Sequence, residues 1–312
     1  MGKISWEVVG SSVVGAPIGL LCLLYIVWGY RKKTQVKDKV VLITGATSGL
    51  GKACAKIFLQ AGCNVILAGR SVDKLKETSD SLRTELGKSL VHDPKLLVMD
   101  LEDVPSLAGK VKDALRFHGR VDILVNNAGI SYRGQIEDTA LEVDRKVMLV
   151  NYFGQIAITK ALLPTMLDQG GGYIVGISSV QGKFSIPYRS AYSASKHAFQ
   201  AFFDCLRAEV ADRNVKVSII SPGYMCTNLS QNAVCSDGSK HGVTDPTTAL
   251  GMSPEYVARR VLQAIEFNQA DVILATLMPK LAYYTRVLFP KTYFSLMRSR
   301  ARKQKINYLK NK

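Results

Sequence analysis

Short apolar runs recur along the chain and are separated by stretches with helical periodicity. Each run has four to six residues, and the seven runs lie at 40–44, 64–68, 96–99, 121–125, 173–177, 215–220 and 271–274. Continuous apolar runs of this length are typical of strands buried on both faces of a parallel sheet. Their alternation with helical stretches, as near 50–61 and 71–87, predicts an α/β fold with a doubly wound parallel sheet.

The strand and helix pattern continues without a convincing linker, so residues 38–275 are predicted to form a single domain. Within it, residues 224–252 are rich in Ser, Asn, Gly and Thr and break the rhythm. A long irregular segment in a compact domain is often a lid or a binding loop. The domain leaves an N-terminal segment, 1–37, and a C-terminal segment, 276–312.

The N-terminal segment contains an uncharged run of 23 residues from Val8 to Tyr30. A helix of this length crosses about 30 Å of hydrocarbon, so the run predicts a transmembrane helix. A cleaved signal peptide is the alternative. The run exceeds a usual signal core, and the strong positive cluster follows it rather than preceding it, so a retained anchor is favoured.

The flank Arg31-Lys32-Lys33 predicts the orientation of this anchor. Positive flanks stay on the cytosolic side, which places the following domain in the cytosol. The six cysteines show no spacing typical of a disulfide framework, in agreement with a reducing compartment. A sequon for N-glycosylation begins at Asn228, but it falls beside the predicted cofactor pocket and therefore says little about the orientation of the anchor. The endoplasmic reticulum membrane is the expected location, with the peroxisomal membrane as an alternative.

The net charge of +16 is unevenly distributed along the 312 residues. Residues 1–39 carry a net +4, and residues 272–312 carry ten Lys/Arg and no acid, which leaves only +2 for the middle. A nucleic-acid-binding protein more often places basic residues across a folded face, so that class is disfavoured. Basic ends beside apolar residues suit an anionic membrane surface, although a solvated basic tail is the alternative. Segment 276–312 is therefore predicted to be membrane-proximal.

A glycine-rich turn follows the first predicted strand, with glycines at Gly45, Gly49 and Gly51. Glycines let the backbone turn tightly and approach a pyrophosphate, and the helix that follows directs its free N–H groups at the phosphates. The spacing differs from GxGxxG. Its position between a buried strand and a helix nevertheless predicts a dinucleotide site.

The ends of the next three strands carry further candidate cofactor contacts. Arg70 and Ser71 follow the second strand, where an NAD site usually has an acid for the ribose hydroxyl. Arg70 could instead pair with the extra phosphate of NADP, so NADP is predicted over NAD; an ordinary surface arginine is the alternative. Asp100 could accept a hydrogen bond from the adenine amino group, and Asn127 could line the path of the cofactor.

Tyr192 and Lys196 lie four residues apart where a helix is predicted to begin, and therefore share one helical face. A nearby ammonium favours the phenolate, so Lys196 is expected to lower the pKa of Tyr192 and make it a usable acid–base group. Spacing alone is weak, because the tail residues Tyr308 and Lys312 share it.

Two further residues give the pair its context. Ser179, at the end of the fifth strand, could hydrogen-bond the oxygen of the substrate. Asn151, in the preceding helical stretch, could hold a water behind Lys196. The four residues together predict hydride chemistry on a carbonyl or an alcohol.

This set of motifs resembles the classical short-chain dehydrogenase/reductase family, in its membrane-anchored branch. The matching segments are TGATSGLG at 44–51, NNAG at 126–129, Asn151, Ser178-Ser179, YSASK at 192–196 and Pro222-Gly223. The resemblance implies a Rossmann-type fold and a catalytic tetrad of Asn151, Ser179, Tyr192 and Lys196. It also implies that Ser48, Leu50 and Thr227 contact the cofactor.

The combined prediction is an oxidoreductase that transfers hydride between NADP(H) and a lipophilic carbonyl or alcohol, such as a steroid, a retinoid or an acylated ketone. The alternative is a membrane-tethered NADP-binding regulator with little turnover. The expected partners are a small lipophilic substrate and the lipid bilayer, and a homodimer is allowed. No metal site and no nucleic acid are expected.

Overall fold

The computed structural model describes residues 33–310, and side chains up to 305. The chain divides into two compact units, Met1–Gln35 and Val36–Lys312. The predicted membrane anchor lies outside the described residues.

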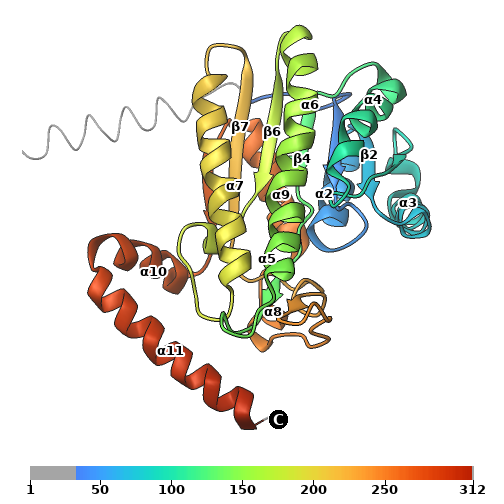
Figure 1. Ribbon diagram of the computed structural model, residues 1–312. Helices are drawn as coiled ribbons and strands as arrows, with labels where there is room; N and C mark the ends of the chain where they lie inside the picture. The colour runs from blue at the N-terminus through green and yellow to red at the C-terminus, as the bar shows by residue number, and fades with distance from the viewer. Residues whose placement is uncertain (1–32, 311–312) are drawn as a thin grey trace, which may run out of the picture. The chain divides into compact units, whose positions relative to one another are not determined.

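Seven parallel strands form one sheet in the order β3-β2-β1-β4-β6-β7-β9 (Figure 1). The predicted doubly wound sheet is confirmed, and each of the seven apolar runs supplies one strand. The strands are β1 (Val40–Thr44), β2 (Asn64–Gly69), β3 (Lys95–Val98), β4 (Ile123–Asn126), β6 (Gly172–Ile177), β7 (Val215–Pro222) and β9 (Asp271–Leu274).

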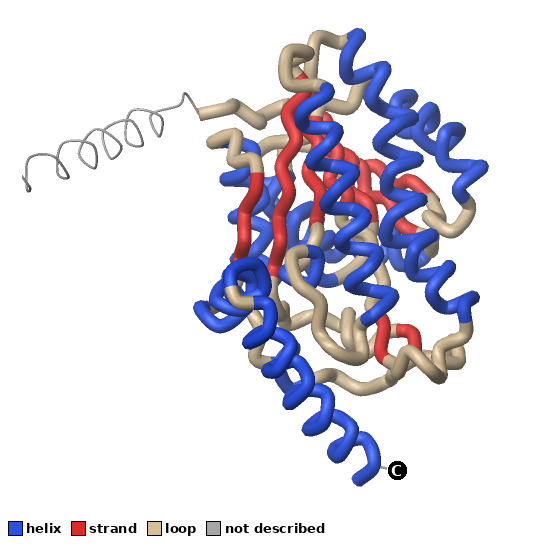
Figure 2. Tube along the Cα trace, turned by 60° about the vertical axis from the view of Figure 1, so that its left-hand side comes forward, coloured by secondary structure: helices blue, strands red, loops and turns tan. Residues whose placement is uncertain are grey.

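Helices cover both faces of this sheet, which explains why the strands are apolar throughout (Figure 1, Figure 2). One face carries α2 (Gly49–Gln60), α3 (Val72–Leu86) and α9 (Pro254–Glu266). The opposite face carries α4 (Leu107–His118), α6 (Gly154–Asp168) and α7 (Ser190–Glu209).

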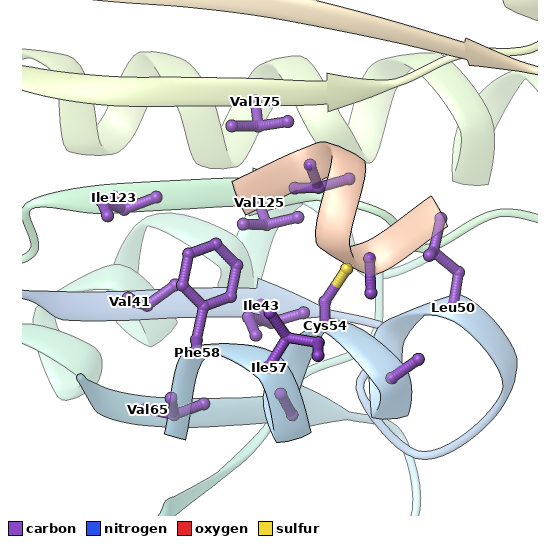
Figure 3. Packing of buried hydrophobic residues seen from close by; sticks show 14 of the residues in the cluster. Val41, Ile43, Leu50, Cys54, Ile57, Phe58, Val65, Ile123, Val125 and Val175 are labelled. Atoms are coloured by element: carbon purple, nitrogen blue, oxygen red, sulfur yellow. The ribbon is translucent and has the colours of Figure 1, made fainter. Parts of the chain in front are cut away.

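Alternate residues of each strand pack into the two hydrophobic cores, one on each face of the sheet. Val41 and Ile43 pack toward α2, whereas Val40 and Leu42 pack toward α4 and α6. Figure 3 shows Phe58 of α2 seated among the strand residues of its face. Because α2 follows β1 directly, this packing fixes the direction in which the helix leaves the glycine-rich turn.

One helix in the described residues is long and apolar enough to cross a membrane, Leu141–Asp168, with a mean hydropathy of 1.2 in its most apolar window. It comprises α5 (Leu141–Met148), a π-helical turn at Leu149–Phe153 and α6. Of that window 44% is buried, and Ile158 and Leu162 belong to the core beneath the sheet. The helix is therefore a structural element of the domain.

The sequence pattern did not predict the small elements around the sheet. Two-residue strands β5 (Tyr132–Arg133) and β8 (Val234–Cys235) pair in parallel, so segment 224–252 is held to the region after β4. The rest of that segment is largely irregular, as expected, apart from α8 (Pro246–Ala249). Short 3-10 turns occur at Gly87–Ser89, Val104–Ser106 and Val180–Gly182, and two further helices, α10 (Leu277–Leu288) and α11 (Pro290–Lys310), follow β9.

Candidate active site

The turn after β1 is crowded enough to require glycine at three positions. Gly45 and Gly49 have positive φ values of 63° and 50°, a region that L side chains rarely adopt. A Cβ on Gly51 would lie 2.1 Å from the carbonyl oxygen of Gly45. The first turn of α2 therefore packs directly against the backbone of the loop, and the N–H groups that begin the helix are left near the cavity.

Hydrogen bonds tie this turn to the end of β4. The Thr44 hydroxyl accepts from the backbone N–H groups of Asn127 (2.9 Å) and Ala128 (3.0 Å). The Asn127 amide nitrogen donates back to the carbonyl oxygens of Thr44 (2.9 Å) and Gly45 (3.3 Å). Asn127 thus shapes the turn, in addition to lining the predicted path of the cofactor.

A cavity of about 550 Å³ opens at the carboxyl ends of the strands, and its volume suits an extended dinucleotide. Most of the residues predicted for the cofactor line it: Gly45, Ser48, Gly49, Leu50, Arg70, Ser71, Asp100, Asn127, Tyr192, Lys196 and Thr227. Gly51, Asn151 and Ser179 are not on its lining. Asn228, the residue of the sequon, does line it.

One end of the cavity is bounded by the ends of β2 and β3. Arg70 is 62% exposed at its side chain, and its guanidinium lies 3.3 Å from a carboxylate oxygen of Glu102. Asp100 accepts a hydrogen bond from the backbone N–H of Glu102, at 3.0 Å. Ser71 caps α3 by accepting from the N–H of Lys74 at 3.4 Å, and the Lys74 side chain also lines the cavity. Sequence reasoning missed Lys74, although its place in the first turn after Arg70 was a usable signal.

The other end of the cavity holds Tyr192 and Lys196, which lie in the first turns of α7 and are 7% and 4% exposed. The Lys196 ammonium nitrogen donates to the carbonyl oxygen of Ile177, at the end of β6, at 2.9 Å. It lies 5.9 Å from the centre of the Tyr192 ring. The predicted pair is therefore brought together at the carboxyl edge of the sheet.

Burial dominates the ionisation of both groups. It raises the pKa of Tyr192, and the hydrogen bond with Ser179 and the charge of Arg133 oppose that rise only in part. Burial lowers the pKa of Lys196 to about 8. The expected direction for Tyr192 is wrong in this structure, because desolvation of the phenolate outweighs the hydrogen bond and the charge that oppose it.

Asn151 sits in the π-helical turn, fully buried, and braces the wall behind Lys196. Its amide oxygen accepts from the N–H of Ile130 (2.8 Å), and its nitrogen donates to the carbonyl of Ile130 (2.9 Å) and to the Ser195 hydroxyl (3.0 Å). A Cβ on Gly129 would meet both the Asn151 oxygen (3.1 Å) and the Lys196 nitrogen (3.6 Å), so the two side chains converge there. π-Turns often occur at functional sites.

Ser179 follows β6 and is 7% exposed. Its hydroxyl accepts from the backbone N–H of Gln181 at 3.1 Å and donates to the carbonyl of Pro222 at 3.4 Å. These bonds hold the hydroxyl at the end of two adjacent strands, where it opposes the rise in the pKa of Tyr192.

A partly buried ion cluster that the sequence did not reveal fastens segment 224–252. Asp245 accepts from Arg133 of β5 at 2.5 and 3.0 Å and lies 3.3 Å from Arg189, directly before α7. Burial is the largest influence on Arg189 and lowers its pKa to about 10. The partners are 112 and 56 residues apart in sequence, so no local motif indicates them.

The short chain dehydrogenase family matches residues 39–237. The fold, the glycine turn and the Tyr192–Lys196 helix agree with this match, and the chain belongs to the short-chain dehydrogenase/reductase family of oxidoreductases. The resemblance predicted from the motifs is thereby confirmed.

Among curated proteins, the chain is similar to Dehydrogenase/reductase SDR family member 7B of Bos taurus, with 51% identity over 92% of this chain and 89% of that protein. It is also similar to the protein of the same name from Xenopus laevis, with 49% identity over 97% and 94% of the two chains.

Two solved structures share the fold. A short-chain dehydrogenase from Streptomyces avermitilis is 30% identical, with a TM-score of 0.71 over 86% of this chain and 99% of that one. An alcohol dehydrogenase from Thermococcus sibiricus, complexed with 5-hydroxy-NADP, is 26% identical, with a TM-score of 0.66 over 77% and 97%.

The lowered pKa of Lys196 predicts the pH dependence of cofactor use. With a pKa of about 8, Lys196 is an ammonium below that pH and an uncharged amine above it. Loss of the charge weakens the attraction for an anionic cofactor, so kcat/KM for the nicotinamide cofactor should fall as the pH rises through about 8, approaching tenfold per unit. Steady-state kinetics at saturating carbonyl measure this. A profile that stays flat from about pH 7 to about pH 10 would contradict it.

Proposed function

We propose that this protein is an NADP-dependent reductase of lipophilic carbonyl compounds, held at a membrane by residues 1–37. The observation that carries the proposal is the convergence of Tyr192 and Lys196 at one end of a cavity whose other end presents Arg70 and Lys74, with Ser179 beside Tyr192. A nicotinamide cofactor supplies the hydride when bound. The side chains of this domain supply binding and the proton.

The proton is assigned to Tyr192. Because burial raises its pKa, the phenol is protonated at neutral pH and can donate to a carbonyl oxygen that becomes an alcohol. Lys196 keeps its ammonium below pH 8 and would stabilise the phenolate that remains. Ser179 is placed to donate a hydrogen bond to the same substrate oxygen, and Asn151 keeps the wall behind Lys196 in position.

The preference for NADP rests on charge at the β2 end of the cavity. Arg70 and Lys74 are both on the lining there, and the position that follows β2 has no acid to repel a phosphate. Glu102 already pairs with Arg70, so a phosphate would have to compete with that carboxylate. The pair is solvent-exposed and therefore weak, which favours exchange of partners.

The lipophilic substrate class rests on the predicted anchor, with the endoplasmic reticulum membrane and a cytosolic domain as the preferred arrangement and the peroxisomal membrane as the alternative. The catalytic domain is assigned to 38–275, and a homodimer is compatible with it. A bilayer concentrates apolar carbonyl compounds such as steroids, retinoids or acylated ketones near a tethered site.

The substrate class is tested with the full chain in lipid nanodiscs. We expect NADPH-dependent reduction of long-chain or polycyclic ketones at a kcat/KM about tenfold or more above that of small water-soluble ketones, since apolar burial favours the larger molecules. Cofactor oxidation and product analysis measure this. Turnover restricted to water-soluble carbonyls would refute the lipophilic class while leaving the reductase chemistry in place.

Arg70→Gln tests the choice of cofactor. Loss of one charge-assisted contact to the extra phosphate should weaken NADPH binding about tenfold and leave NADH binding unchanged. Arg116→Gln is a matched control, because Arg116 is also an exposed arginine paired with an acid, Asp113, and does not line the cavity. Titration calorimetry with both cofactors gives the ratio. Equal losses for NADPH and NADH would remove the argument for NADP.

Tyr192→Phe separates an enzyme from the alternative, a tethered NADP-binding regulator. Removal of the hydroxyl should lower kcat at least about a hundredfold and leave NADPH affinity within about twofold, because the ring that lines the cavity is retained. Tyr308→Phe, which shares the spacing to a lysine, should change neither. If cellular function survives Tyr192→Phe while turnover is lost, the regulator is the better description.

A further inference from the structure

The helices after β9 expose an unusual concentration of large apolar side chains. Of the twenty exposed large hydrophobic side chains in the described residues, nine lie within twenty positions: Leu277, Met278, Leu281, Tyr284, Val287, Leu288, Phe289, Phe294 and Leu296. None of the twelve described residues of α10 is buried. We refer to these nine residues as the α10–α11 surface. Single exposed hydrophobic residues are ordinary, but such a concentration marks a contact with something apolar.

This surface belongs to a firmly attached part of the domain. Tyr293, at the start of α11, is only 3% exposed and packs with Val180, Phe184 and Ile186, and its hydroxyl donates to the carbonyl of Ser185. Farther along α11, the Tyr188 hydroxyl donates to the carbonyl of Ala301 at 3.2 Å, and Arg300 donates to the Tyr224 hydroxyl at 3.2 Å. These contacts fix the helices against the domain.

The corner between the two helices, at Leu288 and Phe289, projects away from the sheet (Figure 1, Figure 2). These two side chains are 64% and 63% exposed. Because Tyr293 packs against the domain, the corner between the two helices has a fixed orientation.

The charge of the same region restricts what can cover it. Asp271 is the last acid of the chain, it is bound to Lys183 at 2.6 Å, and ten Lys/Arg follow it. Lys280, Arg286 and Lys291 are interleaved with the apolar residues of the surface. A second copy of this chain would bring like charges together, so self-association through this surface is unfavourable.

We propose that the α10–α11 surface docks on an anionic lipid bilayer, independently of residues 1–37. Apolar and aromatic side chains beside basic residues, without acids, are the composition of helices that lie in the membrane interface. Each basic residue near an anionic leaflet adds to the attraction, and the lipid headgroups supply the negative charge that this surface lacks. The contact is a property of the two helices that follow the catalytic domain and does not rest on the chemistry of Tyr192.

A second cavity lies directly beneath this surface. It measures about 450 Å³ and is bounded by residues 183–187, which follow Ser179 closely, and by Val287, Phe294 and Met297. Val287 and Phe294 are also part of the exposed surface. Docking would therefore place the loop that leads from Ser179 to α7 next to the bilayer.

The test uses the full chain, which has only two tryptophans, Trp6 and Trp28. In a Trp6→Phe, Trp28→Phe background, Leu288→Trp reports on the surface, and Val91→Trp, replacing a side-chain position of similar exposure (61%), is the control. Both are reconstituted into vesicles of phosphatidylcholine and phosphatidylserine that contain brominated phosphatidylcholine. We expect emission from Leu288→Trp to be quenched about twofold or more, and emission from Val91→Trp to be unchanged.

A second arm tests the charge. Lys280→Gln, Arg286→Gln and Lys291→Gln together should reduce quenching of Leu288→Trp to the level seen in vesicles of phosphatidylcholine alone, whereas Lys76→Gln, Lys88→Gln and Lys112→Gln should not. Equal quenching of both reporters, or quenching of neither, overturns the proposal. So does a dimer or a complex with an acidic protein that buries Leu288 while the lipid leaves it unquenched. The readout is fluorescence, so loss of reductase activity would not affect the result.

Discussion

The close contact between the loop after β1 and the end of β4 is the constraint on which the active site depends. A Cβ on Gly51 would overlap both the carbonyl oxygen of Gly45 and the amide nitrogen of Asn127, which donates to that carbonyl. With no space between loop, strand and helix, α2 can leave the sheet in only one direction. Its apolar face then covers Val41 and Ile43 (Figure 3), and its N–H groups face the cavity.

The acid–base pair depends on a second close contact, between α7 and β6. The helix α7 lies against β6, where the ring of Phe199 would touch any Cβ placed on Gly176, at 2.7 Å. This contact brings Lys196 to the carbonyl of Ile177 and buries both Lys196 and Tyr192. Burial then keeps the phenol protonated and makes the ammonium easier to deprotonate.

The sequence predicted those features that are encoded locally. Strands buried on both faces are continuous apolar runs, so all seven could be located, and the candidates Ser48, Arg70 and Tyr192 each follow directly from a strand or begin a helix. Features set by tertiary contact could not be predicted. The pKa of Tyr192 depends on the burial of its side chain. The two-residue strands β5 and β8 form only by pairing with each other. No sequence pattern near Asp245 indicates the two arginines that it binds.

That carboxylate also determines how segment 224–252 can move. Asp245 neutralises Arg133 and Arg189 together, and both side chains are only 11% exposed. If the segment moved by a small distance, two guanidinium groups would be left side by side without an anion and without full hydration, which is costly. Displacement of the segment is therefore disfavoured, and residues of the segment that line the cavity, among them Thr227 and Asn228, are held at its edge. Opening of the cavity on this side would require the solvation of three charges.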